Sequence, residues 1–271
     1  MPGQYHPLTT KGKFNGTIRI HPERLDIPLK RKKPTVYAIW NDLFHEDVPD
    51  NFIFRALGTM HSAKKHIFLI LTKRPKRMLE LIERYRHEWL KGFESAWPRE
   101  YQHLVLGVTV CNQEEADQKI PLLLQIPAAV IWVSHEPGLG MITYPKEFLA
   151  RGKRAWSVTG GESGLGARPM HPNIPRHDRD QCQVAGVPFL FKHWGEWAPR
   201  KHHGINDEGK YPWGTLDQYA EFFPKTTPWN GRDDIKAWDG LHEAVMIRIG
   251  RKAAGRLLDG REWNELPEVH K

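Results

Sequence analysis

Residues 155–197 read AWSVTGGESGLGARPMHPNIPRHDRDQCQVAGVPFLFKHWGEW and contain two apolar runs separated by a polar segment of helical length. The first run, at 155–159, leads into glycines and polar residues, and the second, at 187–191, ends abruptly on Lys192. Short apolar runs bounded by turn signals are typical of buried strands. Two such runs joined by a helix predict a βαβ unit, in which the strands are parallel.

The same pattern recurs along the earlier part of the chain. Four more apolar runs end on polar residues, and helical spacing follows most of them; they lie at 35–40, 66–71, 104–110 and 130–133. Six strand–helix units in series predict an α/β fold built as a partial (β/α) barrel. A doubly wound open sheet is the alternative, because a single sequence does not fix the order of the strands.

The predicted domains follow changes in composition. Residues 1–33 are polar and predict a basic N-terminal arm, in which the run Lys30–Lys33 is either solvated or a phosphate contact. Residues 34–199 hold the six units and predict the barrel. Residues 200–271 begin with a stretch rich in Pro, Gly, Trp and charge, so we expect an irregular C-terminal appendage packed on the barrel.

Charge and cysteine content exclude several classes of protein. A formal net charge of +8 favours polyanionic partners, nucleic acid first, although solubility alone would also explain it. Two cysteines are too few for a secreted disulfide scaffold and favour a reducing cytoplasm. No apolar run approaches the roughly 20 residues of a membrane span, so no membrane association is expected. The histidines match no metal-ligand spacing, and no metal site is expected.

Candidate binding residues lie where the predicted strands end, because α/β proteins bind ligands at the carboxyl ends of parallel strands. One set is expected to line a ligand: Asn41, Asp42, Thr72, Lys73, Asn112, His135, Glu136, Gly160, Gly161, Glu162 and Ser163. A second set suits phosphate binding or base stacking and is expected to contact a substrate or nucleic acid: Arg74, Arg168, Lys192, His193 and Trp194. No residue is identified as catalytic.

These residues also have structural explanations that the sequence leaves open. Thr72 and the pair Asn41-Asp42 are suited to capping the helices that follow them. Glu162 is suited to a local ion pair with Arg168, and Trp194 to packing the mouth of the barrel. His135 and Glu136 are neighbours on an extended strand end, so their side chains point to opposite sides and do not act together.

Ordered blocks between residues 5 and 268 resemble one known family. They include LTKRPKRM at 71–78, LGVTVCNQ at 106–113, VSHEPGLG at 133–140 and GGESGLGARPMHP at 160–172. On these blocks the chain is similar to the bacteriophage gp-thirty-seven/gp-sixty-eight family, which itself resembles radical S-adenosylmethionine (SAM) enzymes. The resemblance implies a radical-SAM-like partial barrel in the cytoplasm of an infected host cell, acting on nucleic acid or a nucleotide, with SAM lined by the first set of residues.

The resemblance also implies a [4Fe–4S] cluster held by three cysteines N-terminal to these blocks. The sequence has only Cys111 and Cys182, with no C-x-x-C, so it lacks the three thiolates of such a cluster. An upstream segment or a cluster-bearing partner polypeptide would have to supply them, or this lineage has lost radical chemistry. Two other functions therefore stay open: a non-catalytic phage accessory protein that binds DNA or a host protein, and a cluster-free transferase with a nucleotide pocket.

Overall fold

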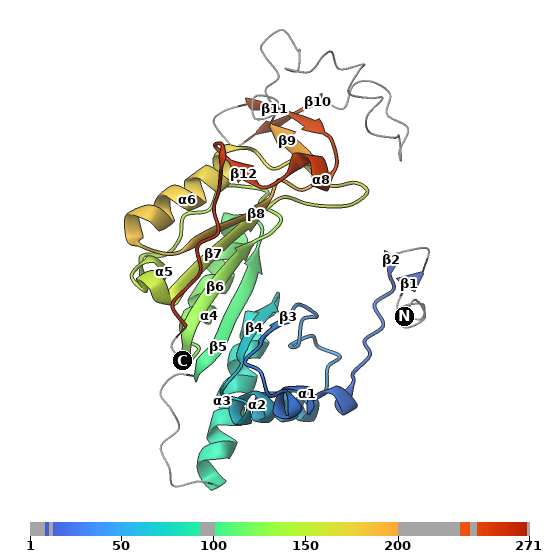
Figure 1. Cartoon of the computed structure of the whole chain (residues 1–271), viewed down its shortest axis with the longest axis vertical. Coiled ribbons are helices and arrows are strands. Elements are labelled where there is room, and N and C mark those ends of the chain that lie inside the picture. Colours follow the sequence, from blue (N-terminus) through green and yellow to red (C-terminus); the bar gives the residue numbers. More distant parts are fainter. Residues whose placement is uncertain (1–8, 11–12, 93–100, 200–233, 239–242, 270–271) are drawn as a thin grey trace. The chain divides into compact units, whose positions relative to one another are not determined.

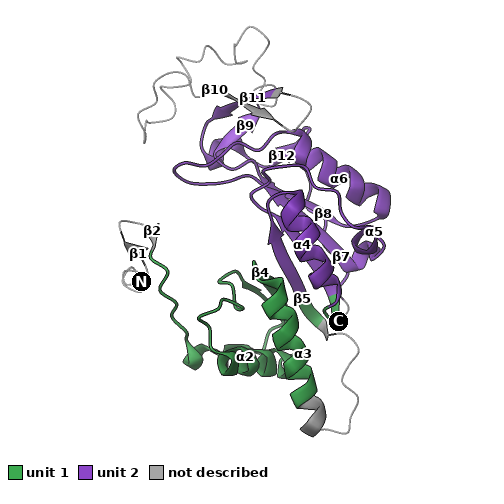
Figure 2. Cartoon of the chain, turned by 180° about the vertical axis from the view of Figure 1, so that it is seen from behind, with its two compact units in different colours: residues 1–105, 126–129, 270–271 green, residues 106–125, 130–269 purple. Residues whose placement is uncertain are grey.

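The computed structural model describes residues 9–10, 13–92, 101–199, 234–238 and 243–269 (Figure 1). The chain divides into two compact units, which Figure 2 colours separately. Unit 1 comprises residues 1–105, 126–129 and 270–271, and unit 2 comprises residues 106–125 and 130–269. Most of the predicted irregular stretch, at 200–233 and 239–242, lies outside the described residues, as do 1–8 and 11–12 of the predicted arm.

Six strands form one sheet in the order β3-β4-β5-β6-β7-β8. Their bounds are β3 (Val36–Ile39), β4 (Ile67–Thr72), β5 (Tyr101–Val110), β6 (Ala128–His135), β7 (Ala155–Gly160) and β8 (Phe189–His193). The pairings β3–β4, β6–β7 and β7–β8 are parallel. All six predicted strands are thus confirmed. The order in space follows the order in the chain, as in a partial (β/α) barrel, whereas a doubly wound sheet reverses its order.

Unit 1 buries one face of each of its two long helices. It contains β1 (Thr9–Thr10), β2 (Lys13–Phe14), the 3-10 turn η3 (Pro22–Arg24), α1 (Ile27–Lys30), α2 (Asp50–Ser62) and α3 (Pro75–Gly92). On α2 the buried residues are Ile53, Ala56, Leu57 and Met60, and on α3 they include Met78, Leu81, Ile82 and Tyr85. Spacings of three and four residues place each set on one side of its helix, where it packs into the core.

Unit 2 has the more completely buried strands. Every residue of β6 and of β7 is buried, as expected for parallel strands covered on both faces. The helices that precede β8 in this unit are α4 (Gln113–Leu124), α5 (Lys146–Leu149) and α6 (Asn173–Ala185), with a 3-10 turn η4 (Gly152–Arg154) before β7. Across both units, no helix within the described ranges is long and apolar enough to cross a membrane.

The described part of the C-terminal region belongs to unit 2. A three-stranded antiparallel sheet, in the order β10-β11-β9, joins β9 (Trp197–Pro199), β10 (Asp234–Trp238) and β11 (Glu243–Arg248). It is followed by α8 (Arg251–Ala254) and the small hairpin β12 (Leu257–Leu258) and β13 (Arg261–Glu262). Residues 263–265 then run antiparallel beside β8: Phe191 N donates to Trp263 O at 3.0 Å, and Glu265 N donates to Phe189 O at 3.2 Å.

Gly107 of β5 shows how closely unit 2 is packed. A Cβ atom at this position would lie 2.1 Å from the indole nitrogen of Trp132, whose side chain is 1 % exposed. Because a buried indole has no room to retreat, we predict that Gly107→Ala lowers the free energy of unfolding by about 3 kcal/mol, at the upper end of the usual penalty for overpacking. Urea denaturation followed by circular dichroism measures the change.

Gly58 in the middle of α2 is the matched control for this prediction. A Cβ there would meet the Tyr85 hydroxyl at 3.5 Å, an ordinary contact, so Gly58→Ala should be neutral or stabilise by up to about 1 kcal/mol. Equal effects of the two substitutions would contradict the packing described for Gly107.

Candidate functional site

The residues that the sequence singles out divide between the two units. Unit 1 contains Asn41, Asp42, Thr72, Lys73 and Arg74, which follow or end β3 and β4. Unit 2 contains the other predicted residues, which lie at or just beyond the ends of β5, β6, β7 and β8. Each unit therefore places its candidates at the carboxyl ends of strands, and we describe the two groups separately.

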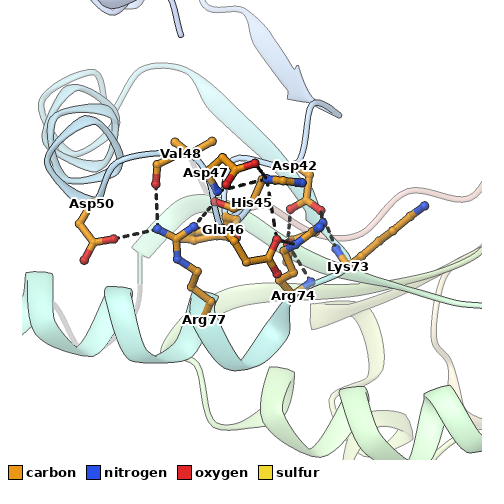
Figure 3. Close-up of polar contacts among 11 residues, drawn as sticks. Asp42, His45, Glu46, Asp47, Val48, Asp50, Lys73, Arg74 and Arg77 are labelled. Atoms are coloured by element: carbon orange, nitrogen blue, oxygen red, sulfur yellow. Dashed lines mark hydrogen bonds and ion pairs between the residues drawn. The ribbon is translucent and has the colours of Figure 1, made fainter. Parts of the chain in front are cut away.

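In unit 1, Asp42 is the centre of a network of internal contacts (Figure 3). Thr72, which is 1 % exposed, donates its hydroxyl to Asp42 Oδ1 at 2.5 Å. The Arg74 guanidinium pairs with Asp42 and, through Nε, with Glu46 Oε2 at 2.5 Å. These contacts occupy both oxygens of Asp42, so the structure uses this predicted ligand-binding residue to join the ends of β3 and β4.

The capping roles considered for this group differ in outcome. Helix α2 begins only at Asp50, with Pro49 as its N-cap residue, so the capping role for Asn41 or Asp42 is wrong. Thr72 accepts the Arg74 backbone N–H at 3.0 Å and stabilises the turn that leads into α3. Asn41 is exposed, and the Lys73 side chain is exposed and extends away from the network in Figure 3.

Arg77, which the sequence did not single out, holds the loop between β3 and α2. Its two terminal nitrogens donate to the backbone oxygens of His45 and, at 2.8 Å, of Val48, and also to Asp50 Oδ1 at 2.8 Å (Figure 3). Only the planar fork of an arginine presents several donors in this arrangement. No local pattern signals such a role, because the partners lie about 30 residues earlier in the chain.

We predict that Arg77→Lys lowers the free energy of unfolding by about 2–3 kcal/mol, because an ammonium group cannot reach the carbonyls and the carboxylate together. Arg84 is the control: it pairs with the same Asp50 at 2.7 Å, but its side chain is 55 % exposed. Arg84→Lys should change stability by less than about 0.5 kcal/mol, as is usual for surface pairs. Urea denaturation compares the two variants, and equal losses would rule out the role given to Arg77.

In unit 2, His135 is buried and faces helix α6. Its Nδ1 lies 2.8 Å from Asp178 Oδ2, and both side chains are 0 % exposed. Thr159 of β7 donates its hydroxyl to the same Asp178 oxygen at 2.6 Å, and His135 Nε2 lies 3.3 Å from Cys111 O. Burial alone would lower the pKa of His135, but the charge and hydrogen bond of Asp178 outweigh it and raise that pKa. This histidine is therefore placed in the interior, away from any ligand at the strand ends.

Asp178 was missed from the sequence, although one signal was available. It lies four residues from Ile174 and four from Cys182, both of which are buried on the same face of α6. A carboxylate on the apolar face of a predicted helix requires a buried partner. Cys182 lies in the same interior, where burial raises the pKa of its thiol well above the ordinary value.

The His135–Asp178 pair predicts a pH-dependent stability. The folded-state pKa of His135 is raised above its ordinary value of 6.5, so the imidazolium stabilises the fold below that pH, and the contribution disappears as pH rises through the folded pKa. His135→Gln should lower the free energy of unfolding by about 3–5 kcal/mol near pH 6, and by less at higher pH. Urea denaturation from pH 5.5 to 9 provides the comparison.

An exposed histidine of α3 serves as the control. His87→Gln should change stability by less than about 0.5 kcal/mol throughout the pH range, as is usual for surface substitutions. If the loss caused by His135→Gln were constant with pH, or grew as pH rises, the charged state assigned to His135 would be wrong.

Glu136, the next residue, lies on the opposite side of the strand end and meets Lys192 of β8. Glu136 Oε2 and Lys192 Nζ are 2.7 Å apart, and the side chains are 17 % and 47 % exposed. A Cβ on Gly160, at the end of the intervening strand β7, would lie 3.1 Å from the Glu136 carboxylate. The missing side chain at Gly160 therefore lets Glu136 and Lys192 approach each other across β7.

A β-bulge positions Lys192 for this contact. Thr159 pairs with Phe191 and Gly160 pairs with His193, which leaves Lys192 as the additional residue of β8. Bulges redirect side chains and are frequent beside active sites. The neighbouring His193 is half-buried, burial lowers its pKa, and its Nδ1 has no hydrogen-bond partner among the described residues. A carboxylate and an ammonium group thus meet at the ends of β6 and β8, and the next residue of β8 carries an imidazole of lowered pKa.

The remaining candidates have contacts within the chain. Arg168 forms a bidentate ion pair with Glu162, with both N–O distances at 2.9 Å, which confirms the local pair considered from the sequence. Asn112 caps α4 by accepting Glu115 N at 3.0 Å. Trp194 is 1 % exposed and donates its indole N–H to Leu257 O at 2.9 Å. Gly161 packs closely against the backbone of the following strand end, since a Cβ on it would lie 1.9 Å from Trp194 O. Ser163 is exposed.

The thiols of the chain do not fit a [4Fe–4S] cluster, because three thiolates are required and only Cys111 and Cys182 are present. Cys182 is also buried. Within the described ranges, no group of three or more His, Cys, Asp or Glu side chains is placed to hold a metal ion.

Comparisons of the chain with curated proteins and with solved structures give no match. One protein family, described as protein of unknown function (DUF5131), matches residues 3–267, which is nearly the whole chain. The protein therefore belongs to the DUF5131 family.

Proposed function

We propose that this chain is a radical-SAM-like half-barrel protein that acts in the modification of nucleic acid or a nucleotide, and that its ligand site lies in unit 2. The observation that carries the proposal is the Glu136–Lys192 pair, with His193 beside it, at the carboxyl ends of β6 and β8. Ligands of parallel α/β proteins bind at this edge of the sheet. The phage setting and the cytoplasm of an infected cell follow from the resemblance of the sequence blocks.

The two charged side chains, Glu136 and Lys192, offer complementary groups to an amino acid ligand. Glu136 carries a carboxylate suited to an ammonium group, and Lys192 carries an ammonium suited to a carboxylate. The methionine part of SAM has both an ammonium and a carboxylate, so the donor set suits it, and the ligand would exchange partners with the existing ion pair.

On this proposal the chain itself binds and orients SAM, whose sulfonium group supplies a transferable carbon. Reductive radical chemistry requires three cluster-bearing cysteines in addition to the residues described, in a preceding segment or in a partner polypeptide. Within unit 2, the buried His135–Asp178 pair fixes the last residue of β6 to helix α6. This contact keeps the next residue, Glu136, in position. A cluster-free transferase would use the same site for the same ligand.

A non-catalytic accessory protein that binds DNA or a host protein is the second candidate. It is favoured by exposed cations of unit 1 that have no ion-pair partner among the described residues, such as Lys32, Lys33, Lys64 and Lys65. SAM binding separates the candidates, because an accessory protein has no need of this ligand.

We expect the chain to bind radiolabelled SAM saturably in equilibrium dialysis. Glu136→Gln and Lys192→Met should each weaken the affinity by about tenfold or more, since each removes a charge-assisted contact. Lys153→Met is the matched control: Lys153 forms an exposed ion pair with Glu268 elsewhere in unit 2, and its loss should leave the affinity within about twofold.

Two outcomes would refute the proposed site. Absence of saturable binding by the unsubstituted protein would remove SAM as the ligand. Equal losses in Lys192→Met and Lys153→Met would show that net charge, and not the strand-end pair, governs the affinity. Circular dichroism of each variant distinguishes a lost contact from a lost fold.

A further inference from the structure

Two cationic runs that are distant in the sequence lie together in unit 1. Lys30–Lys33 leads from α1 into β3, and Lys64–Lys65 leads from α2 into β4. Strands β3 and β4 are parallel neighbours, with Val36 opposite Ile67. The two runs therefore lie next to each other at the amino-terminal ends of these two strands. We call the six residues Lys30, Arg31, Lys32, Lys33, Lys64 and Lys65 the lysine edge.

The buried side chain of His66 holds the two runs together. Its Nδ1 accepts the Thr35 backbone N–H at 3.1 Å, so its ring proton is on Nε2, which donates to Pro28 O at 2.8 Å. The Ile67 backbone N–H adds a hydrogen bond to Thr35 O at 3.1 Å. The imidazole of His66, which is 0 % exposed, therefore joins the segment that carries Lys64 and Lys65 to the segment that carries Lys30–Lys33.

The chain displays these cations to solvent. Lys64 and Lys65 are the central residues of a turn closed by His66 N donating to Ala63 O at 3.0 Å, and all six side chains are exposed. The two segments that contain the cationic runs, residues 27–36 and 61–66, have no acidic residue. Among the described residues the lysine edge has one ion pair, Lys30 with Asp26 at 3.7 Å, and both of those side chains are exposed.

Such an edge has an electrostatic consequence. The two runs lead into neighbouring strands, which lie about 4.8 Å apart. This spacing of the backbones is shorter than the Debye length of about 8–10 Å, so the fields of the two runs overlap. Like charges held together destabilise the fold slightly unless an anionic partner offsets their repulsion. A polyanion with closely spaced charges offsets it most effectively.

We propose that the lysine edge binds the phosphate backbone of double-stranded nucleic acid. Five of its six residues are lysines, which act as point charges toward phosphates and lack the planar fork that reads base edges, so the contact would position nucleic acid without reading its sequence. An anionic membrane is less favoured, because α1, with only four residues, is too short to lie in a lipid interface as an amphipathic helix. The choice of nucleic acid rests on the proposed function.

The test is the salt dependence of binding to a fluorescently labelled duplex of about 30 base pairs, measured by anisotropy between about 50 and 200 mM KCl. Each phosphate contact contributes about 0.9 to the slope of log affinity against log salt. The double variants Lys32→Gln/Lys33→Gln and Lys64→Gln/Lys65→Gln should each reduce that slope by about 2 and weaken binding at about 100 mM KCl by tenfold or more.

The matched control removes two charges elsewhere. Lys76→Gln/Lys146→Gln substitutes two exposed lysines outside the lysine edge and should leave the slope within about 0.5 of that of the unsubstituted protein. Slopes for the edge variants equal to that of the control would overturn the proposal. So would binding to vesicles of phosphatidylcholine and phosphatidylserine without binding to the duplex.

SAM dialysis on the same variants separates this inference from the proposed function. Loss of duplex binding with retained SAM affinity supports the lysine edge. Duplex binding that depends on the lysine edge, in a protein that does not bind SAM, supports the edge and refutes only the strand-end ligand site. Unchanged duplex binding by the edge variants overturns the inference, whatever the result with SAM.

Discussion

The arrangement of unit 2 depends on one buried charged group, the Asp178 carboxylate. Burying a charge is unfavourable by several kcal/mol unless it is paired and hydrogen-bonded. His135 of β6 and Thr159 of β7 both bind Asp178 Oδ2, whereas the buried Oδ1 has no hydrogen-bond partner among the described residues. Helix α6 is thereby fixed to the last residue of β6 and to β7 next to Gly160. Side chains alternate along a strand, so fixing His135 toward α6 directs Glu136 to the other face.

The sequence predicted the fold better than the candidate site. Six apolar runs with polar ends were sufficient to locate six strands, and the signal is most continuous in β6 and β7, which are buried on both faces. Strand order was not predictable, since it depends on which strands meet in space. Site residues were expected where they occur, at strand ends, but their partners from distant parts of the chain were not. The Glu136–Lys192 pair joins residues 56 positions apart, and Asp178 acts through His135, 43 positions away.

Contacts between residues that are close in the sequence were predictable, whereas contacts between distant residues were not. Glu162 and Arg168 are six positions apart, and their pairing was among the expectations. Asp42 was assigned to a cofactor or a helix cap, whereas it binds Thr72 and Arg74, about 30 positions later. Arg77 carries no pattern at all, because backbone oxygens, which every residue has, are its main partners. Residue type indicates which groups a side chain can bind, but the fold determines which of those groups lie within its reach.

The C-terminal residues 263–265 have a consequence for how copies of this chain meet one another. Strand β8 is the last strand of the sheet, and an uncovered last strand offers a row of backbone groups to any other extended chain. Trp263 O and Glu265 N occupy those groups on β8, and the Glu265 carboxylate accepts the Phe189 N–H at 3.0 Å. The chain thus closes this side of its sheet with its own backbone, which protects it from intermolecular strand addition and aggregation.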